Sequence, residues 1–145
     1  MALEISEKQL DEIGRHGARA YPNECCGALL GVADGDAKRV RALLALDNRR
    51  QGEAARTRFL VTADDHLWAE KEARAQGLDI VGWYHSHPDH PARPSEFDRE
   101  HAWPWYSYIV VRVARGEPQE ATSWVLAEDR SRFLEEKIGT TDEHR

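Results

Sequence analysis

The amino-acid sequence predicts a single α/β domain. Its 145 residues are enough for one sizeable hydrophobic core and too few for two. The share of apolar residues, 41%, is that of an ordinary globular protein, so extensive disorder is not expected. Stretches with helical spacing alternate with short apolar runs typical of strands, and no internal repeat or linker separates them.

The first predicted helix begins after Ser6 and ends near Ala20. Ser6 and Gln9 form a capping box, which satisfies amide groups at the start of a helix. Gly14 and Gly17 each lower the helix propensity by roughly 1 kcal/mol. They also leave a flat stripe on the helix, and we expect this stripe to lie close to a sheet.

Two more helices are predicted from their capping residues. Thr62 caps a helix that runs through Gln76, and Gly77 then supplies the left-handed conformation that closes it. Ser95 caps a shorter helix that ends at about Trp103.

Strands are predicted where short apolar runs are bounded by turn residues. The predicted strands cover residues 24–32, 39–46, 59–61, 79–87, 106–113, 121–127 and 133–138. The polar stretch 47–56 is predicted to be a mobile loop. We therefore expect one domain over residues 1–138, followed by a disordered C-terminal tail over residues 139–145.

Charge and cysteine content exclude several classes of protein. The net charge of −6 disfavours nucleic acid as a partner, because the phosphate backbone is also negative. No apolar run approaches the ~20 residues that cross a bilayer, and the N-terminus does not resemble a signal peptide. Cys25 and Cys26 are adjacent, which seldom suits a disulfide, so we interpret them as small core residues. We expect a cytoplasmic protein with no membrane partner.

A candidate metal site is formed by His85, His87 and Asp98. On a strand, residues i and i+2 share a face with Cα atoms roughly 6.5 Å apart, so the two imidazoles can share one ion. A loop with three prolines then leads to Asp98 in the first turn of the short helix, where it can supply a third ligand. Three protein ligands leave the fourth tetrahedral position for water, which is typical of catalytic zinc.

A hydrolase also needs a base for the water, and several carboxylates in the sequence could serve. Glu24 is the best candidate because it opens an apolar strand directly after a helix. At such a junction a polar side chain can point into a cleft rather than into bulk water. A base there could take the proton of the water and pass it to a leaving amine.

These motifs resemble the JAMM family, the catalytically competent MPN-domain metallopeptidases. The resemblance rests on residues 22–31 (PNECCGALLG), 82–88 (GWYHSHP) and 94–98 (PSEFD), in the order of the family. It implies His85, His87 and Asp98 as zinc ligands, Glu24 as general acid–base, and Ser95 as a donor to the tetrahedral oxyanion. It also implies the fold of the family, a curved mixed β-sheet flanked by helices and related to that of cytidine deaminases.

The resemblance further implies a substrate. The family removes ubiquitin or ubiquitin-like modifiers by cutting after their C-terminal glycine, and this chain is most similar to short bacterial members that act on ubiquitin-like sulfur-carrier proteins. It lacks room for the long insertions of eukaryotic deubiquitinating members, so polyubiquitin is not expected. The expected partner is a sulfur-carrier protein or its C-terminal conjugate. The leaving group stays open among free cysteine, a lysine side chain and a longer peptide, and the sequence does not indicate an oligomeric state.

Several other interpretations compete with this one. A non-catalytic MPN-type scaffold would only bind a partner, but it has no need of an open zinc site. His85 and His87 could be buried, hydrogen-bonded core residues, and Glu24 could be a surface charge. Ser95 would cap its helix whether or not it contacts an oxyanion. A zinc deaminase is excluded because the His-x-Glu and Pro-Cys-x-x-Cys signatures are missing.

Overall fold

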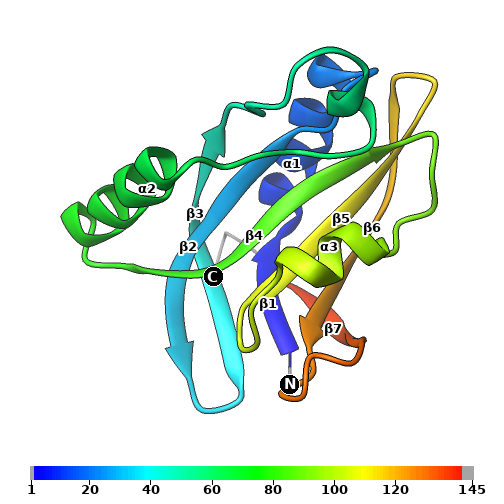
Figure 1. The fold of residues 1–145 in the computed structure, drawn as a ribbon. Coiled ribbons are helices and arrows are strands. Elements are labelled where there is room, and N and C mark those ends of the chain that lie inside the picture. Colours follow the sequence, from blue (N-terminus) through cyan, green and yellow to red (C-terminus); the bar gives the residue numbers. More distant parts are fainter. Residues whose placement is uncertain (1, 142–145) are drawn as a thin grey trace.

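The structure is a computed structural model that describes residues 2–141 (Figure 1). Along the chain the elements are β1 (Ala2–Ser6), α1 (Glu7–Ala20), β2 (Cys26–Asp34), β3 (Ala37–Leu46), the 3₁₀ turn η1 (Gly52–Arg56), α2 (Ala63–Ala75), β4 (Asp79–Pro88), α3 (Glu96–His101), β5 (Ser107–Ala114), β6 (Glu117–Leu126) and β7 (Phe133–Thr141). None of the helices in this part of the chain has the length and apolarity needed to cross a bilayer.

The seven strands form one mixed sheet that closes on itself in the order β1-β3-β2-β4-β5-β6-β7. β1 completes the closure because it pairs in parallel with both β3 and β7. β4 and β5 are also parallel, and the remaining neighbours are antiparallel. The predicted curved mixed sheet flanked by helices is therefore confirmed.

The central strands are buried on both faces. Leu29 of β2 points into the core that also contains residues of β1 and α1. Its neighbours Ala28 and Leu30 point to the opposite face and pack with Ala69 and Ala73 of α2. Because both faces are covered, β2 is apolar along nearly its whole length instead of alternating with polar residues.

Helix α1 lies against the sheet through its glycines, as the sequence predicts. The Ser6 hydroxyl accepts a hydrogen bond from the Gln9 amide at 3.1 Å, and the Gln9 side chain accepts one from the Ser6 amide. A Cβ atom at Gly17 would stand 2.9 Å from Val113 Cγ2 and 3.2 Å from Ser86 Cβ. Any larger residue at this position would therefore push the helix away from β4 and β5.

The structure differs from the predictions in the first residues and in the segment between β3 and α2. β1 was not predicted because it is short and runs directly into a helix cap. The predicted strand 59–61 is wrong. Its residue Leu60 hydrogen-bonds to the Asn48 side chain and to the Arg49 amide, outside any sheet. The predicted loop 47–56 contains η1.

The C-terminal strand extends beyond the predicted end of the domain at residue 138. Residues 137–141 of β7 pair with residues 2–6 of β1, the strand that the sequence did not predict. This pairing includes residues 139–141, which were expected to belong to the tail. The rest of the predicted tail, residues 142–145, lies outside the described part of the chain. Cys25 and Cys26 are buried, as expected of core residues.

Candidate metal centre

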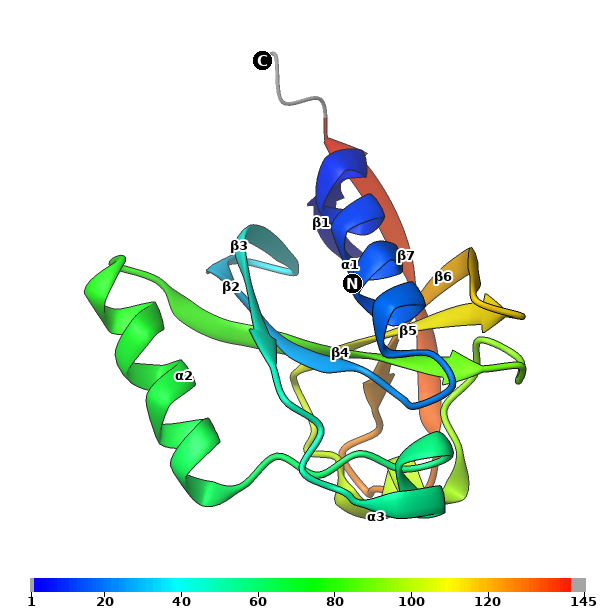
Figure 2. The same ribbon diagram turned by 90° about the horizontal axis from the view of Figure 1, so that it is seen from above.

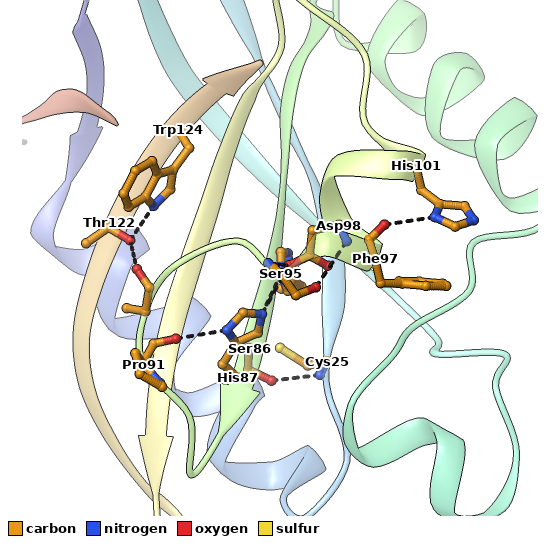
Figure 3. A network of polar contacts seen from close by, with 12 residues as sticks. Cys25, Ser86, His87, Pro91, Ser95, Phe97, Asp98, His101, Thr122 and Trp124 are labelled. Atoms are coloured by element: carbon orange, nitrogen blue, oxygen red, sulfur yellow. Dashed lines mark hydrogen bonds and ion pairs between the residues drawn. The ribbon is translucent and has the colours of Figure 1, made fainter. Parts of the chain in front are cut away.

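The end of β4 directs alternate side chains to opposite sides of the sheet. Ser86 points toward α1, where its hydroxyl accepts a hydrogen bond from the Cys25 amide at 2.8 Å (Figure 3). His85 and His87 point the other way, toward α3, which lies across β4 from α1 (Figure 2). The two-residue period of a strand thus separates a core serine from two candidate ligands.

Three candidate ligand atoms meet between β4 and α3. His85 Nε2 lies 3.1 Å from His87 Nε2, and Asp98 Oδ2 lies 3.1 Å from the first nitrogen and 3.2 Å from the second. The three side chains are only 2%, 7% and 6% exposed. A tetrahedral zinc ion with bonds of about 2.0–2.1 Å separates its ligand atoms by about 3.3 Å, so these residues fit that ion.

The hydrogen bonds of the two imidazoles also suit a cation. His87 Nδ1 lies 2.9 Å from the Pro91 carbonyl oxygen, which can only accept, so Nδ1 carries the proton and Nε2 presents a lone pair. That lone pair faces a carboxylate oxygen of Asp98, an arrangement that becomes favourable with a positive charge between them. His85 Nδ1 is buried without a hydrogen-bond partner among residues 2–141.

Asp98 is oriented by the start of α3. Its Oδ2 atom accepts a hydrogen bond from the Ser95 amide at 2.8 Å, while the Asp98 amide donates to the Ser95 hydroxyl at 3.1 Å. Burial by itself would raise the pKa of Asp98, but His85, His87 and the Ser95 amide together hold this pKa well below its ordinary value. The carboxylate is therefore ionised and fixed, as a metal ligand must be.

Glu24 lies in the connection between α1 and β2, with its side chain buried beside the histidines. One of its carboxylate oxygens and one ring nitrogen from each of His85 and His87 lie within 4.8 Å of one another. Glu24 Oε1 has no hydrogen-bond partner among the described residues. Burial, and then the negative charge of Asp98, raise the pKa of Glu24 to about 9. A cation between these groups would favour the ionised form.

Four groups therefore converge, but they are not equivalent. His85, His87 and Asp98 are joined by contacts of 3.1–3.2 Å, whereas Glu24, whose carboxylate lies within 4.8 Å of both histidine nitrogens, forms no hydrogen bond with them. All four groups could therefore contribute to one metal site. The interpretation of Glu24 as a surface charge is excluded by its burial, since only 3% of the residue is exposed.

Asn48 is a residue beside the candidate site that the sequence did not predict. Its side-chain amide donates hydrogen bonds to the carbonyl oxygens of Glu24 at 3.0 Å, Ala55 at 3.4 Å and Arg58 at 3.0 Å. Its Oδ1 atom accepts a hydrogen bond from the Leu60 amide at 3.1 Å. Asn48 thus connects the loop after β3 to the backbone of Glu24. The only signal in the sequence is an asparagine at the start of a polar loop, a residue type that commonly bonds to nearby backbone.

An apolar cleft of about 280 Å³ opens on the side of His85 and Asp98. Its aromatic lining consists of Phe59, Trp83, Phe97, Trp103, Tyr106 and Tyr108. Trp105 is not part of this lining and contacts Lys38. The lining gives an extended, largely apolar surface that leads to the candidate metal ligands.

A second pocket of about 270 Å³ borders the same group of residues. It is lined by Glu24, Thr57, His87, His90, Pro91, Arg93 and Ser95. The two pockets share no residue, and each contains at least one of the two histidines. The candidate metal site therefore borders both pockets.

Comparisons with known proteins agree with this geometry. Residues 6–127 match the family described as prokaryotic homologues of the JAB domain. A desampylase from Haloferax volcanii is 36% identical to this chain over 111 residues, which make up 76% of this chain and 77% of that protein. The matched residues 6–127 include both Glu24 and the β4–α3 region.

Solved structures show the same fold. A protein from Salinibacter ruber, known from its solution structure, is 49% identical in sequence to this chain and superposes with a TM-score of 0.76. The match covers 99% of this chain and 93% of the Salinibacter ruber chain. A JAB1/MPN domain protein from Archaeoglobus fulgidus has a TM-score of 0.55 at 18% identity over 96% and 99% of the two chains, a likeness of fold alone. The chain belongs to the family of prokaryotic homologues of the JAB domain, as the predicted resemblance implies.

Proposed function

We propose that the protein is a zinc-dependent metallopeptidase of the JAMM type that cleaves after the C-terminal glycine of a ubiquitin-like sulfur-carrier protein. One observation carries this proposal. His85 Nε2, His87 Nε2 and Asp98 Oδ2 lie 3.1–3.2 Å apart, beside the buried and unpartnered carboxylate of Glu24. A scaffold that only binds a partner gains nothing from burying these four groups together, because each burial costs free energy.

The proposed roles follow from the positions of the side chains. His85, His87 and Asp98 would hold zinc, which when bound polarises a carbonyl and makes water more acidic. Glu24 would take a proton from the attacking water and deliver it to the leaving nitrogen. Its backbone is held for this purpose, because the Glu24 amide donates to the Ala55 carbonyl at 2.7 Å and its carbonyl accepts from Asn48.

Ser95 can combine two roles. Its oxygen accepts the hydrogen bond from the Asp98 amide that caps α3, which leaves the hydroxyl proton free to donate. Ser95 lines the second pocket, which also contains Glu24. We propose that it donates to the oxyanion that develops during attack on the carbonyl.

The apolar cleft would bind the C-terminal tail of the carrier. β4 pairs with β2 on one side and with β5 on the other, so it offers no free edge beside the histidines. The segment 59–61 does offer a free edge, because the backbone groups of Phe59 and Val61 have no hydrogen-bond partner among the described residues. Both residues line the cleft, so an extended tail can pair with them as an added strand. Glycines suit such a tail because they carry no Cβ that would clash near the metal site.

The similarity to an archaeal desampylase supports a ubiquitin-like protein as the substrate class. The test uses zinc-loaded protein and carrier-protein conjugates ending in Gly-Gly-Cys or Gly-Gly-Lys, compared with versions whose last glycine is alanine or valine. We expect cleavage directly after the second glycine and a large loss with valine. Equal cleavage of unrelated peptides would instead indicate a general zinc peptidase. Absence of both zinc and hydrolysis would favour the scaffold.

A further inference from the structure

Two arginines lie against one aromatic ring of the apolar cleft. The guanidinium carbon of Arg58 is 4.7 Å from the centre of the Phe97 ring, and that of Arg50 is 5.5 Å from it. His101 stacks on the same ring, with ring centres 4.1 Å apart, which leaves the other face for the guanidinium groups. Phe97 directly precedes Asp98, and Figure 3 shows both on α3. Two positive charges are therefore held close to the candidate metal centre.

Neither of these arginines has an acidic partner. Arg49, the neighbour of Arg50 in the chain, forms two hydrogen bonds with Asp65, at 2.9 and 3.0 Å. Arg50 and Arg58 form no ion pair with any acidic side chain among residues 2–141, although the chain has a net charge of −6. The Nε atom of Arg50 is buried without a hydrogen-bond partner in this part of the chain. Because like charges repel, an anion that binds both groups is favoured.

One side chain fixes the backbone of both arginines. The Oδ1 atom of Asn48 accepts a hydrogen bond from the Arg50 amide at 2.9 Å, and its Nδ2 atom donates one to the Arg58 carbonyl at 3.0 Å. The same Nδ2 atom donates to the carbonyl of Glu24 at 3.0 Å. The two arginines thus project from a loop whose position is tied to the candidate base, so less ordering is needed when a ligand binds.

The contact with Phe97 leaves the hydrogen-bond donors of the arginines free. A guanidinium group contacts an aromatic ring through its face, while its N–H groups point outward in its own plane. Those N–H groups can bind a carboxylate through two parallel hydrogen bonds. Arg50 is the one arginine among the described residues that line the cleft, whose walls are largely apolar. An ion pair formed there is screened less by water than one on an open surface.

The proposed occupant of the cleft indicates where the anion comes from. In the proposed function the C-terminal tail of the carrier lies along residues 59–61 and ends at the candidate metal centre. Phe59 follows Arg58 and stacks on His85 with ring centres 4.9 Å apart. A tail in this position passes Arg50 with residues that precede its terminal glycines. A neutral side chain there would leave both positive charges unpaired, and a basic one would add a third.

We propose that Arg50 and Arg58 bind the carboxylate of an aspartate or glutamate that precedes the terminal Gly-Gly of the carrier tail, so that the enzyme selects acidic tails over neutral and basic ones. This inference rests on the proposed function, in which the tail occupies the cleft. The guanidinium groups form no hydrogen bond with His85, His87 or Asp98. They therefore act on the binding of the tail and not on the chemical step.

The experiment uses carrier conjugates in which one of the four residues before Gly-Gly is glutamate, glutamine or lysine and the other three are alanine. Four residues cover roughly 13 Å of extended chain. At one of these positions we expect zinc-loaded wild-type protein to cleave the glutamate conjugate with a kcat/KM about tenfold higher than the glutamine conjugate, the range of a charge-assisted hydrogen bond. The lysine conjugate should be cleaved more slowly still. The difference should lie in KM, and about 1 M salt should reduce it.

Variants of the two arginines test the assignment. Arg50→Gln and Arg58→Gln should each move the glutamate-to-glutamine ratio toward one, and Arg50→Lys should restore part of it because the charge remains. Arg58→Glu should reverse the preference, so that the lysine conjugate is cleaved faster than the glutamate conjugate. The control is Arg56→Gln, the same change at an exposed position of the same loop that does not line the cleft, and it should keep the ratio of the wild type.

The outcomes separate this inference from the proposed function. Equal cleavage of the glutamate and glutamine conjugates at all four positions would overturn the role of the arginines and leave the peptidase intact. A preference that persists unchanged in Arg50→Gln and Arg58→Gln would overturn it as well. If no conjugate is cleaved, the proposed function is wrong. Calorimetric titration with the same carriers does not depend on hydrolysis, and equal affinities for the glutamate and glutamine tails would then overturn this inference separately.

Discussion

His87 and Pro91 are joined by a hydrogen bond of 2.9 Å between the imidazole Nδ1 and the backbone carbonyl oxygen. This bond fixes the tautomer of the ring, so Nε2 faces His85 and Asp98 with its lone pair. It also ties the loop after β4 to one of the candidate ligands. The site is therefore organised by the protein itself, which is the condition for binding zinc without a large rearrangement.

The first prediction concerns metal content. Purified protein should contain about one zinc per chain, and His87→Ala should lose most of it because only two of the three close ligand atoms remain. Elemental analysis after dialysis measures this directly. His101→Ala is the matched control, since His101 bonds to the Phe97 carbonyl and not to the ligand atoms. Full zinc occupancy in His87→Ala would remove the ligand assignment.

Glu24→Gln should separate metal binding from catalysis. The amide keeps the shape of the side chain but cannot take up a proton, so zinc content should remain and the rate should fall by about 10²–10⁴. Both quantities are measured on one preparation, with Glu53→Gln in the exposed turn η1 as the control. Near-normal turnover would show that another group is the base.

The stability of the metal-free protein should depend on the ionisation of Glu24. Burial, followed by the charge of Asp98, raises the pKa of Glu24 from 4.5 to about 9. The folded state holds this proton more tightly than the unfolded state does. The stability that protonated Glu24 contributes to the folded state is therefore fully present below pH 4.5 and is lost as the pH rises toward 9.

Urea unfolding of the zinc-free wild type and of Glu24→Gln across this pH range measures the effect. The difference in the free energy of unfolding between the two proteins should grow with pH in favour of the variant, because glutamine has no proton to lose. Adding zinc should reduce the difference, since a cation compensates the buried charge. A difference that stays constant with pH would contradict the raised pKa.

The candidate ligands could be predicted from the sequence because they lie close to one another along the chain. His85 and His87 are two residues apart on one strand, and Asp98 follows after a loop whose prolines limit its conformations. The periodicity of a strand and the capping signal at Ser95 are enough to bring these side chains together. Several carboxylates could serve as the base; Glu24 is the best candidate because it opens an apolar strand directly after a helix, and the resemblance to the family implies the same residue.

The missed features depend on contacts between distant parts of the chain. Residues 2–6 become a strand because they pair with residues 137–141, and neither segment has a strong pattern of its own. The segment 59–61 looks like a strand because it is apolar, but the sheet has no free edge for it beside β4. The loop before it is ordered by Asn48, whose partners follow no local pattern.

Ser95→Ala tests whether the serine acts in catalysis as well as in capping. Loss of the cap should destabilise the protein by about 1 kcal/mol. If the hydroxyl also donates to the oxyanion, the rate should fall by about 10²-fold. Thr62→Ala is the matched control, because Thr62 caps α2 by accepting a hydrogen bond from the Asp65 amide at 3.1 Å. Thr62→Ala should lose similar stability without a comparable loss of rate. If Ser95→Ala and Thr62→Ala lose the same amount of rate, Ser95 acts only as a cap.

The last prediction concerns Asn48, which holds the backbone of Glu24. Asn48→Asp keeps the size of the side chain but replaces three donated hydrogen bonds with a charge that faces the carbonyl oxygens of Glu24, Ala55 and Arg58. The loop should open, so hydrogen exchange of the amides in residues 49–60 should become faster. Activity should fall by about tenfold because a small displacement of the base weakens proton transfer.

Zinc content distinguishes this role from a general loss of the fold. Asn48 contacts none of His85, His87 and Asp98, so Asn48→Asp should bind zinc as the wild type does. The control is Asn23→Asp, which makes the same chemical change at an exposed position between α1 and β2. If Asn48→Asp loses zinc as well as activity, or if exchange in the loop is unchanged, the proposed connection between Asn48 and Glu24 is wrong.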